Sequence, residues 1–108
     1  MSDPPSDQGS GARWLAARTG SAPAPLRERI IDYARAGLDG PDPPGALAEA
    51  GLTALRVVTA HRGDRSAALD LLAADALITL ALLAQAETAP ARLGEFALQR
   101  LTTAVNPA

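Results

Sequence analysis

The sequence of 108 residues has no cysteine, no lysine, one histidine and only three aromatic residues. Without cysteine there is no disulfide framework, no thiolate zinc site and no cysteine nucleophile. A single histidine and scattered carboxylates do not supply the three or four converging ligands of a metal site, so we expect neither a metal nor a cofactor. The scarcity of aromatic and β-branched residues disfavours strands.

The charge is low and slightly acidic, because ten arginines stand against twelve acidic residues, for a formal net charge of −2. Nucleic-acid-binding proteins carry a basic face that neutralises phosphates, so we expect no nucleic-acid partner. The chain does not begin with a basic segment followed by an apolar stretch. No secretory signal is therefore indicated, and the cytoplasm is the expected location.

Alanine and leucine, with 25 and 16 copies, dominate the composition, and both are strong helix formers. Asp42 and Asp64 are suitable N-caps, and Gly63 is a suitable helix end between them. The expected helices cover residues 12–18, 25–36, 65–87 and 90–104, and a third helix that begins at Pro43 or Gly45 and reaches His61 or Arg62. Their short connections predict an all-α fold, namely a small antiparallel helical bundle of four main helices plus a short N-terminal helix.

A chain of this length predicts one domain. Residues 1–10 contain proline, serine, aspartate and glycine with nothing to bury, so they are expected to form a disordered tail before a single domain at 11–108. Trp14, the only tryptophan, either pins the first helix onto the bundle or contacts a partner. Arg29 is expected on the solvent side of its helix, and Gly51 within a helix predicts a close approach of two helices.

The segment 65–87 carries two leucine-rich stripes when its residues are placed about 100° apart around a helix. The stripes are Leu69, Leu72, Ala76, Leu80 and Leu83, and Leu71, Ile78 and Leu82; Asp75 and Thr79 fall between them, and Asp70, Ala74, Ala81 and Gln85 lie on the far side. Such a helix is either the central core helix or contacts a second chain through Leu71, Ile78 and Leu82. Its two aspartates disfavour a membrane span, so we expect no membrane partner.

Asp75 is the first candidate for a ligand-binding side chain, because apolar neighbours would force its carboxylate to find a partner. Arg56 or Arg62 on the preceding antiparallel helix could be that partner. Arg62 and Arg65, together with Arg56, could also hold a phosphate or carboxylate at the start of the next helix. The structural alternatives are a buried ion pair, a solvated gap between the stripes, and an ordinary capped turn.

His61 is expected in the last turn of the third helix, where it interacts with free carbonyl groups. No nucleophile or phosphate-binding loop accompanies it, so no catalytic residue is predicted. The sequence therefore predicts a non-enzymatic protein–protein interaction module, such as an adaptor, assembly factor or small regulatory subunit, that forms a homodimer through an apolar helical face. The alternative is a binder of a small molecule or anion, with a pocket between the third and fourth helices that uses Asp75 and nearby arginines.

Overall fold

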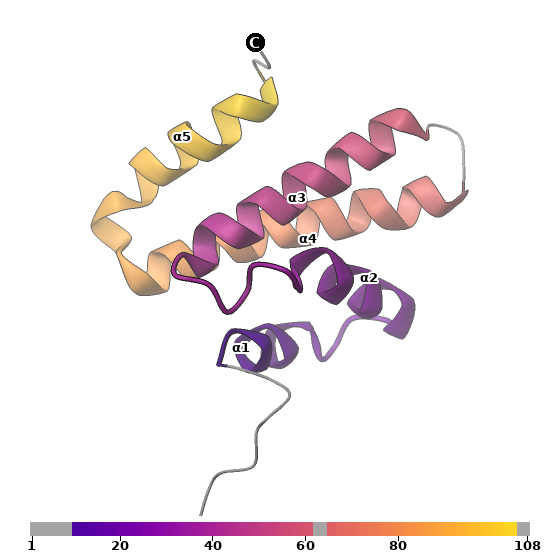
Figure 1. Cartoon of the computed structure of the whole chain (residues 1–108), viewed down its shortest axis with the longest axis horizontal. Coiled ribbons are helices and arrows are strands. Elements are labelled where there is room, and N and C mark those ends of the chain that lie inside the picture. Colours follow the sequence, from indigo (N-terminus) through magenta and orange to yellow (C-terminus); the bar gives the residue numbers. More distant parts are fainter. Residues whose placement is uncertain (1–9, 62–64, 106–108) are drawn as a thin grey trace, which may run out of the picture.

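A computed structural model describes residues 10–61 and 65–105 of the chain. These residues form five α-helices and no strand, which confirms the predicted all-α fold (Figure 1). The helices are α1 (Ser10–Thr19), α2 (Ala24–Ala34), α3 (Pro43–Ala60), α4 (Arg65–Thr88) and α5 (Leu93–Val105), and a short 3-10 helix, Pro90–Arg92, precedes α5. The tail expected at residues 1–10 lies outside the described part up to residue 9, and α1 begins at Ser10.

The start of α3 follows the capping signal in the sequence. Asp42 is the N-cap, and its Oδ1 accepts a hydrogen bond from the backbone N–H of Gly45 at 3.1 Å. At the other end, the backbone N–H of His61 donates to two carbonyl oxygens of the last turn. The cap and helix end expected at Asp64 and Gly63 lie outside the described residues.

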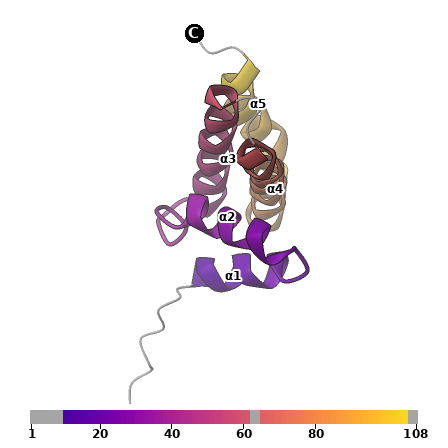
Figure 2. The ribbon, with the colours of Figure 1, turned by 90° about the vertical axis from the view of Figure 1, so that its right-hand side faces the viewer.

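The central feature of the fold is a hairpin of α3 and α4, which lie side by side in both ribbon views (Figures 1 and 2). The two helices approach each other closely at Gly51. A Cβ atom there would lie 2.8 Å from Cγ1 of Ile78 and 3.4 Å from the carbonyl oxygen of Ala74. Only a residue without a side chain fits at this distance, so the predicted close approach at Gly51 is confirmed.

The shorter helices enclose the core from the sides of this hairpin. Figure 2 shows α1 and α2 lying across α3 and α4 rather than along them. Four large side chains, one from each of α1 to α4, are almost fully buried: Leu15, Ile30, Leu47 and Leu77. From α5, Phe96 enters the core, and an ion pair of 3.1 Å between Arg100 and Asp42 ties α5 to the start of α3.

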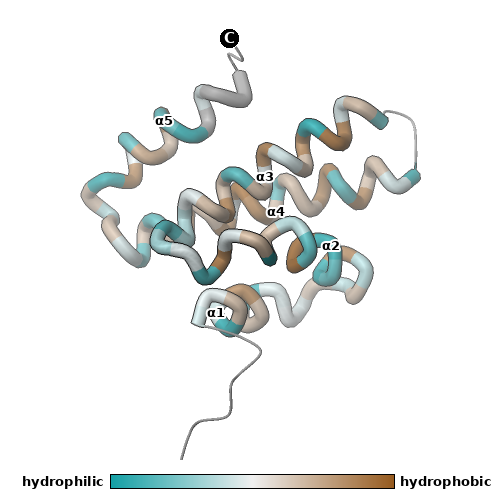
Figure 3. Tube along the Cα trace, in the orientation of Figure 1, coloured by the Kyte–Doolittle hydropathy of each residue, from teal (hydrophilic) through white to brown (hydrophobic). Residues whose placement is uncertain are grey.

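The buried face of α4 differs from the expected one. Its buried residues are Ala67, Asp70, Ala73, Ala74, Leu77, Leu80, Ala81 and Ala84. The side that the leucine pattern placed far from the core therefore faces it, whereas Leu72 and Leu83 are exposed. The cause is the short distance between α3 and α4, because closely spaced backbones leave room for alanine but not for rows of leucine. Apolar residues recur along α4 (Figure 3), and they include both buried and exposed side chains.

Candidate functional site

Asp70 forms a buried polar link between α4 and α2. It is 4% exposed, and its Oδ1 accepts hydrogen bonds from Nη1 of Arg29 at 2.5 Å and from the hydroxyl of Tyr33 at 2.9 Å. The guanidinium compensates the charge that burial would otherwise disfavour. Burial and the hydrogen bond to Asp70 raise the pKa of the Tyr33 phenol above its usual 10.0. Arg29 thus lies on the inner side of α2, contrary to the expected solvent position, and the three groups hold two helices together.

The open side of α4 exposes large apolar side chains. Leu71, Leu72 and Leu83 are 50%, 53% and 39% exposed. The residues that recur at alternating spacings of three and four on this side are Leu69, Leu72, Ala76, Thr79, Leu83 and Ala86, which we name the outward seam. None of the six is buried. The seam is apolar except for one threonine, and is therefore a candidate interaction surface.

The four residues predicted to contact a partner differ in their exposure to solvent. Leu71 is open to solvent, as a partner contact requires. Ile78 and Leu82 are half-buried, with Ile78 against Gly51 of α3 and Leu82 against the core. Trp14 is half-buried, and its Nε1 donates a hydrogen bond of 2.9 Å to Glu87 of α4. The second stripe therefore serves mainly the inside of the molecule.

The residues of the predicted ligand site do not converge. Asp75 is exposed on the open side of α4, so its carboxylate is not forced into the interior. Arg56 is also exposed, and its Nη2 donates to the hydroxyl of Thr53 on its own helix. Arg65 lies ten positions before Asp75, about 15 Å away along the helix axis. Arg62 lies outside the described residues. No ion pair of the described part of the chain joins any of these groups.

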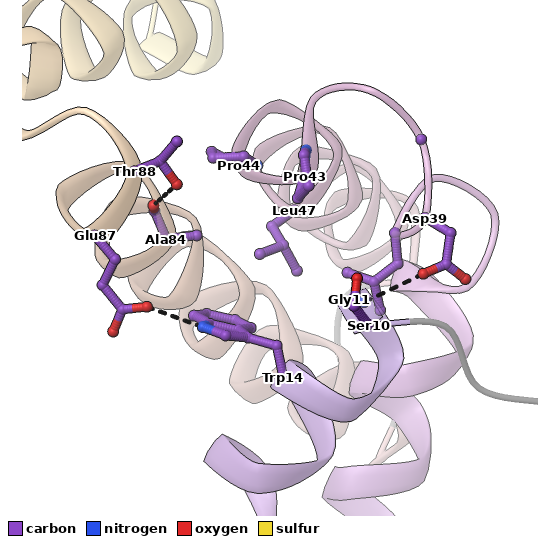
Figure 4. A pocket seen from close by; sticks show the side chains of 12 residues that line it. Ser10, Gly11, Trp14, Asp39, Pro43, Pro44, Leu47, Ala84, Glu87 and Thr88 are labelled. Carbon is purple, nitrogen blue, oxygen red and sulfur yellow. Dashed lines mark hydrogen bonds between the residues drawn. The ribbon is translucent and has the colours of Figure 1, made fainter. Parts of the chain in front are cut away.

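A cleft occurs elsewhere, between α1, the segment before α3, and the end of α4 (Figure 4). Its volume is about 770 Å³. The apolar residues that line it include Leu38, Pro44, Leu47 and Ala84, all of them buried. The polar wall is formed mainly by Trp14, Asp39 and Glu87. In Figure 4 the carboxylates of Asp39 and Glu87 lie on opposite sides of the opening.

Hydrogen bonds from α1 position both carboxylates of this cleft. Glu87 accepts from the indole of Trp14 and forms an ion pair of 2.9 Å with Arg18, whose guanidinium lies 4.5 Å from the centre of the Trp14 ring. The hydrogen bonds from Trp14 and Arg18 lower the pKa of Glu87 below its usual 4.5, because they stabilise the ionised carboxylate. On the other side, Oδ1 of Asp39 accepts from the backbone N–H of Gly11 at 3.2 Å.

Sequence reasoning did not find the cleft or the role of Asp70. The cleft forms where α1 packs against residues that are far along the chain. Local sequence patterns do not predict such long-range packing. Asp70 had one usable signal, since it shares a helix face with Ala74 and Ala81, and small residues on one face indicate close packing as readily as solvent exposure.

Comparisons with protein-family models, curated proteins and solved structures found no match for this chain. Among the described residues, α4 is long and apolar enough to cross a membrane by length and composition, a test that the core helix of a soluble protein also passes. Within residues 10–61 and 65–105, no group of three histidine or acidic side chains is placed to hold a metal ion.

Proposed function

We propose that this protein is a non-enzymatic interaction module that self-associates through the outward seam of α4. The supporting observation is the exposure of Leu72 and Leu83 on the same side of the helix. A helix of 24 residues is about 36 Å long, which gives a second helix a continuous surface to pack against. Neighbouring exposed apolar side chains on one helix side are a feature of binding faces.

The seam has the spacing of a coiled coil. Its residues alternate three and four positions apart, which is the 3.5-residue repeat that keeps one side of a helix against a partner helix. The only ionisable side chain between the seam and Leu71 is Asp75, which lies beside the seam and not in it. The part of the seam from Leu69 to Leu83 can therefore face a second α4 without burying a charge.

The seam is also complementary to itself in antiparallel orientation. When the two-fold axis crosses the seam at a level midway between residues 77 and 78 along the helix, Leu72 is opposite Leu83 of the partner subunit. Leu69 is then opposite the partner's Ala86, and Ala76 is opposite the partner's Thr79. Large residues meet large or small ones towards the ends, and two small residues meet near the centre. A two-fold homodimer requires this kind of self-complementary patch.

The expected dimer is weak. Covering the open half of a leucine contributes about 1 kcal/mol. Six leucines from two seams then contribute about 6 kcal/mol, which is comparable with the lower estimates of about 4–15 kcal/mol for the lost freedom of association. We therefore expect a concentration-dependent equilibrium between monomer and dimer.

Solution mass, measured by size-exclusion chromatography with light scattering over a concentration series, tests the proposal. The wild type is expected to dimerise at high concentration, and Leu72→Glu and Leu83→Glu to remain monomeric. Leu98→Glu is the matched control, because Leu98 is 71% exposed but lies on α5, away from the seam. A wild type that is monomeric throughout, or a Leu98→Glu variant that dissociates equally, contradicts the proposal.

Engineered cysteines test the orientation, because the natural chain contains none. Leu72→Cys and Leu83→Cys chains, one of them affinity-tagged, are mixed and oxidised. The antiparallel arrangement predicts a disulfide between the two variants and little cross-linking of either variant alone. Efficient cross-linking of each variant with itself would instead indicate a parallel dimer.

We further propose a cytoplasmic location and a function without nucleic acid. The net charge of −2 supports the second point, and the link of Asp70 to α2 supports packing of α4 within a soluble domain. Flotation with phosphatidylcholine vesicles tests the alternative occupant of the seam. A chain that stays monomeric and floats with the vesicles would assign the seam to lipid and overturn the dimer.

A further inference from the structure

We infer that the cleft beside Trp14 binds a small organic cation with an apolar body. The cleft shares no residue with the outward seam, so this inference is independent of self-association. It also differs from the anion site considered from the sequence, because the residues that line it include two carboxylates and no arginine or histidine.

The size and lining of the cleft suit a small molecule. Ligand pockets commonly measure about 300–1,000 Å³ and have an apolar lining with a few placed polar groups. This cleft measures about 770 Å³, and Leu38, Leu47 and Ala84 are among the apolar residues along it. This apolar lining favours a ligand with an aliphatic or aromatic group over a fully hydrated ion.

The charged side chains at the opening of the cleft determine whether a positively or a negatively charged ligand is favoured. Glu87 pairs with Arg18, and its carboxylate is ionised at neutral pH, as for an ordinary glutamate. Asp39 accepts one hydrogen bond, from the N–H of Gly11, and forms no ion pair within the described residues. The two carboxylates with one arginine leave a net negative charge at the opening. An ammonium group is favoured there, and a carboxylate or phosphate is repelled.

The cleft is a stable part of the fold, because contacts on two sides of the cleft fix the position of α1. Leu15 anchors α1 in the core, and Glu87 binds the side chains of Trp14 and Arg18. At the start of α1, a Cβ atom on Gly11 would lie against the carbonyl oxygen of Leu38, so glycine permits the close approach that forms this wall.

Trp14 provides the measurement, because it is the only tryptophan and lines the cleft. The probe is adamantan-1-amine, a compact apolar cage with one ammonium group and no absorbance that interferes with tryptophan. Adamantan-1-ol and adamantane-1-carboxylate are the controls with the same body and a neutral or negative group. Titrations are followed by Trp14 fluorescence and, in parallel, by isothermal calorimetry, so that a spectroscopically silent binding event is still detected.

The amine is expected to bind saturably, the alcohol more weakly and the carboxylate least. Asp39→Asn keeps an acceptor for the N–H of Gly11, and Glu87→Gln keeps one of the two acceptor oxygens that bind Trp14 and Arg18. Each change removes a charge and should weaken amine binding about three- to fivefold, as expected for a partly exposed ion pair. Neither change should affect the alcohol. Asp75→Asn, which removes an exposed charge outside the cleft, is the matched control and should leave binding unchanged.

Two results would overturn the inference. One is the absence of saturable amine binding by both methods. The other is equal binding of amine, alcohol and carboxylate, which would show an apolar cleft without selectivity for charge. The same titrations on Leu72→Glu separate this site from the dimer, because the amine should bind to that monomeric variant with unchanged affinity.

Discussion

Replacing Gly51 by alanine should destabilise the protein, although the same change usually stabilises a helix. In a helix interior, alanine is favoured over glycine by up to about 1 kcal/mol. At this position the added Cβ would lie 2.8 Å from Cγ1 and 3.3 Å from the backbone nitrogen of Ile78. Neither atom belongs to the free end of a flexible side chain, so the helices must move apart. Overpacking of this kind costs about 1–3 kcal/mol.

Gly94→Ala is the matched control, because a Cβ atom at Gly94 in α5 would meet nothing within 4 Å. The difference in unfolding free energy between the two alanine variants isolates the overpacking cost, and should be about 1–3 kcal/mol. In thermal unfolding followed by circular dichroism, each kcal/mol corresponds to about 4–8 °C for a domain of this size. Gly51→Ala should melt below the wild type, and Gly94→Ala should melt at or above it.

The double variant Gly51→Ala with Ile78→Ala locates the cause of the effect. Truncating Ile78 removes the Cγ1 atom and leaves the backbone contacts at 3.3 and 3.4 Å, so in that background Gly51→Ala should cost less than in the wild type. The reasoning is refuted if Gly51→Ala raises the melting temperature as much as Gly94→Ala does. An equal loss in stability with and without the Ile78 side chain would show that Cγ1 of Ile78 is not the contact responsible, and would leave only the backbone contacts of α4 with the added Cβ.

Two further predictions concern the link between α2 and α4. Asp70→Asn should lower the unfolding free energy by about 2 kcal/mol, because it leaves the partly buried charge of Arg29 without its partner. Asp75→Asn on the open side should change the unfolding free energy by less than about 0.5 kcal/mol. Urea unfolding measures both variants, and equal effects would contradict the burial of Asp70 and the exposure of Asp75. Tyr33 is the only tyrosine, so absorbance at alkaline pH should show a single phenol that titrates above 10.0. Because folding raises this pKa, the associated stability is present below pH 10.0 and is lost as the pH rises through the folded value, and a phenol that titrates at or below 10.0 would argue against its contact with Asp70.

Local chemistry accounts for what could be predicted of the fold. Alanine and leucine set the helices, and proline, glycine and capping aspartates set most of their ends, because these signals act within one helical turn. Asp42 caps α3 as predicted, and the helix extends to Ala60 with His61 as its C-cap, close to the predicted end. Gly51 indicated a close helix contact, although its partner, Ile78, could not be identified from the sequence.

The orientation of α4 could not be predicted for a physical reason. Leucines surround much of this helix, so hydropathy does not distinguish its inner from its outer side. The tertiary structure decides between them through distance: at Gly51 the backbone of α3 approaches α4 closely, and alanines fit between them where leucines would not. In this orientation of α4, Asp70 is buried and its negative charge is compensated by Arg29, while Leu72 and Leu83 are exposed.

The sequence by itself determined the helices, their approximate ends and the absence of thiol chemistry, because each depends on residues that are close together in the chain or on composition. Only the tertiary structure decided which side of α4 is open, and only the crossing of α1 over the end of α4 produced a cleft with carboxylates at Asp39 and Glu87. Both depend on contacts between residues dozens of positions apart, and such contacts are set by how side-chain volumes fit together rather than by any local pattern.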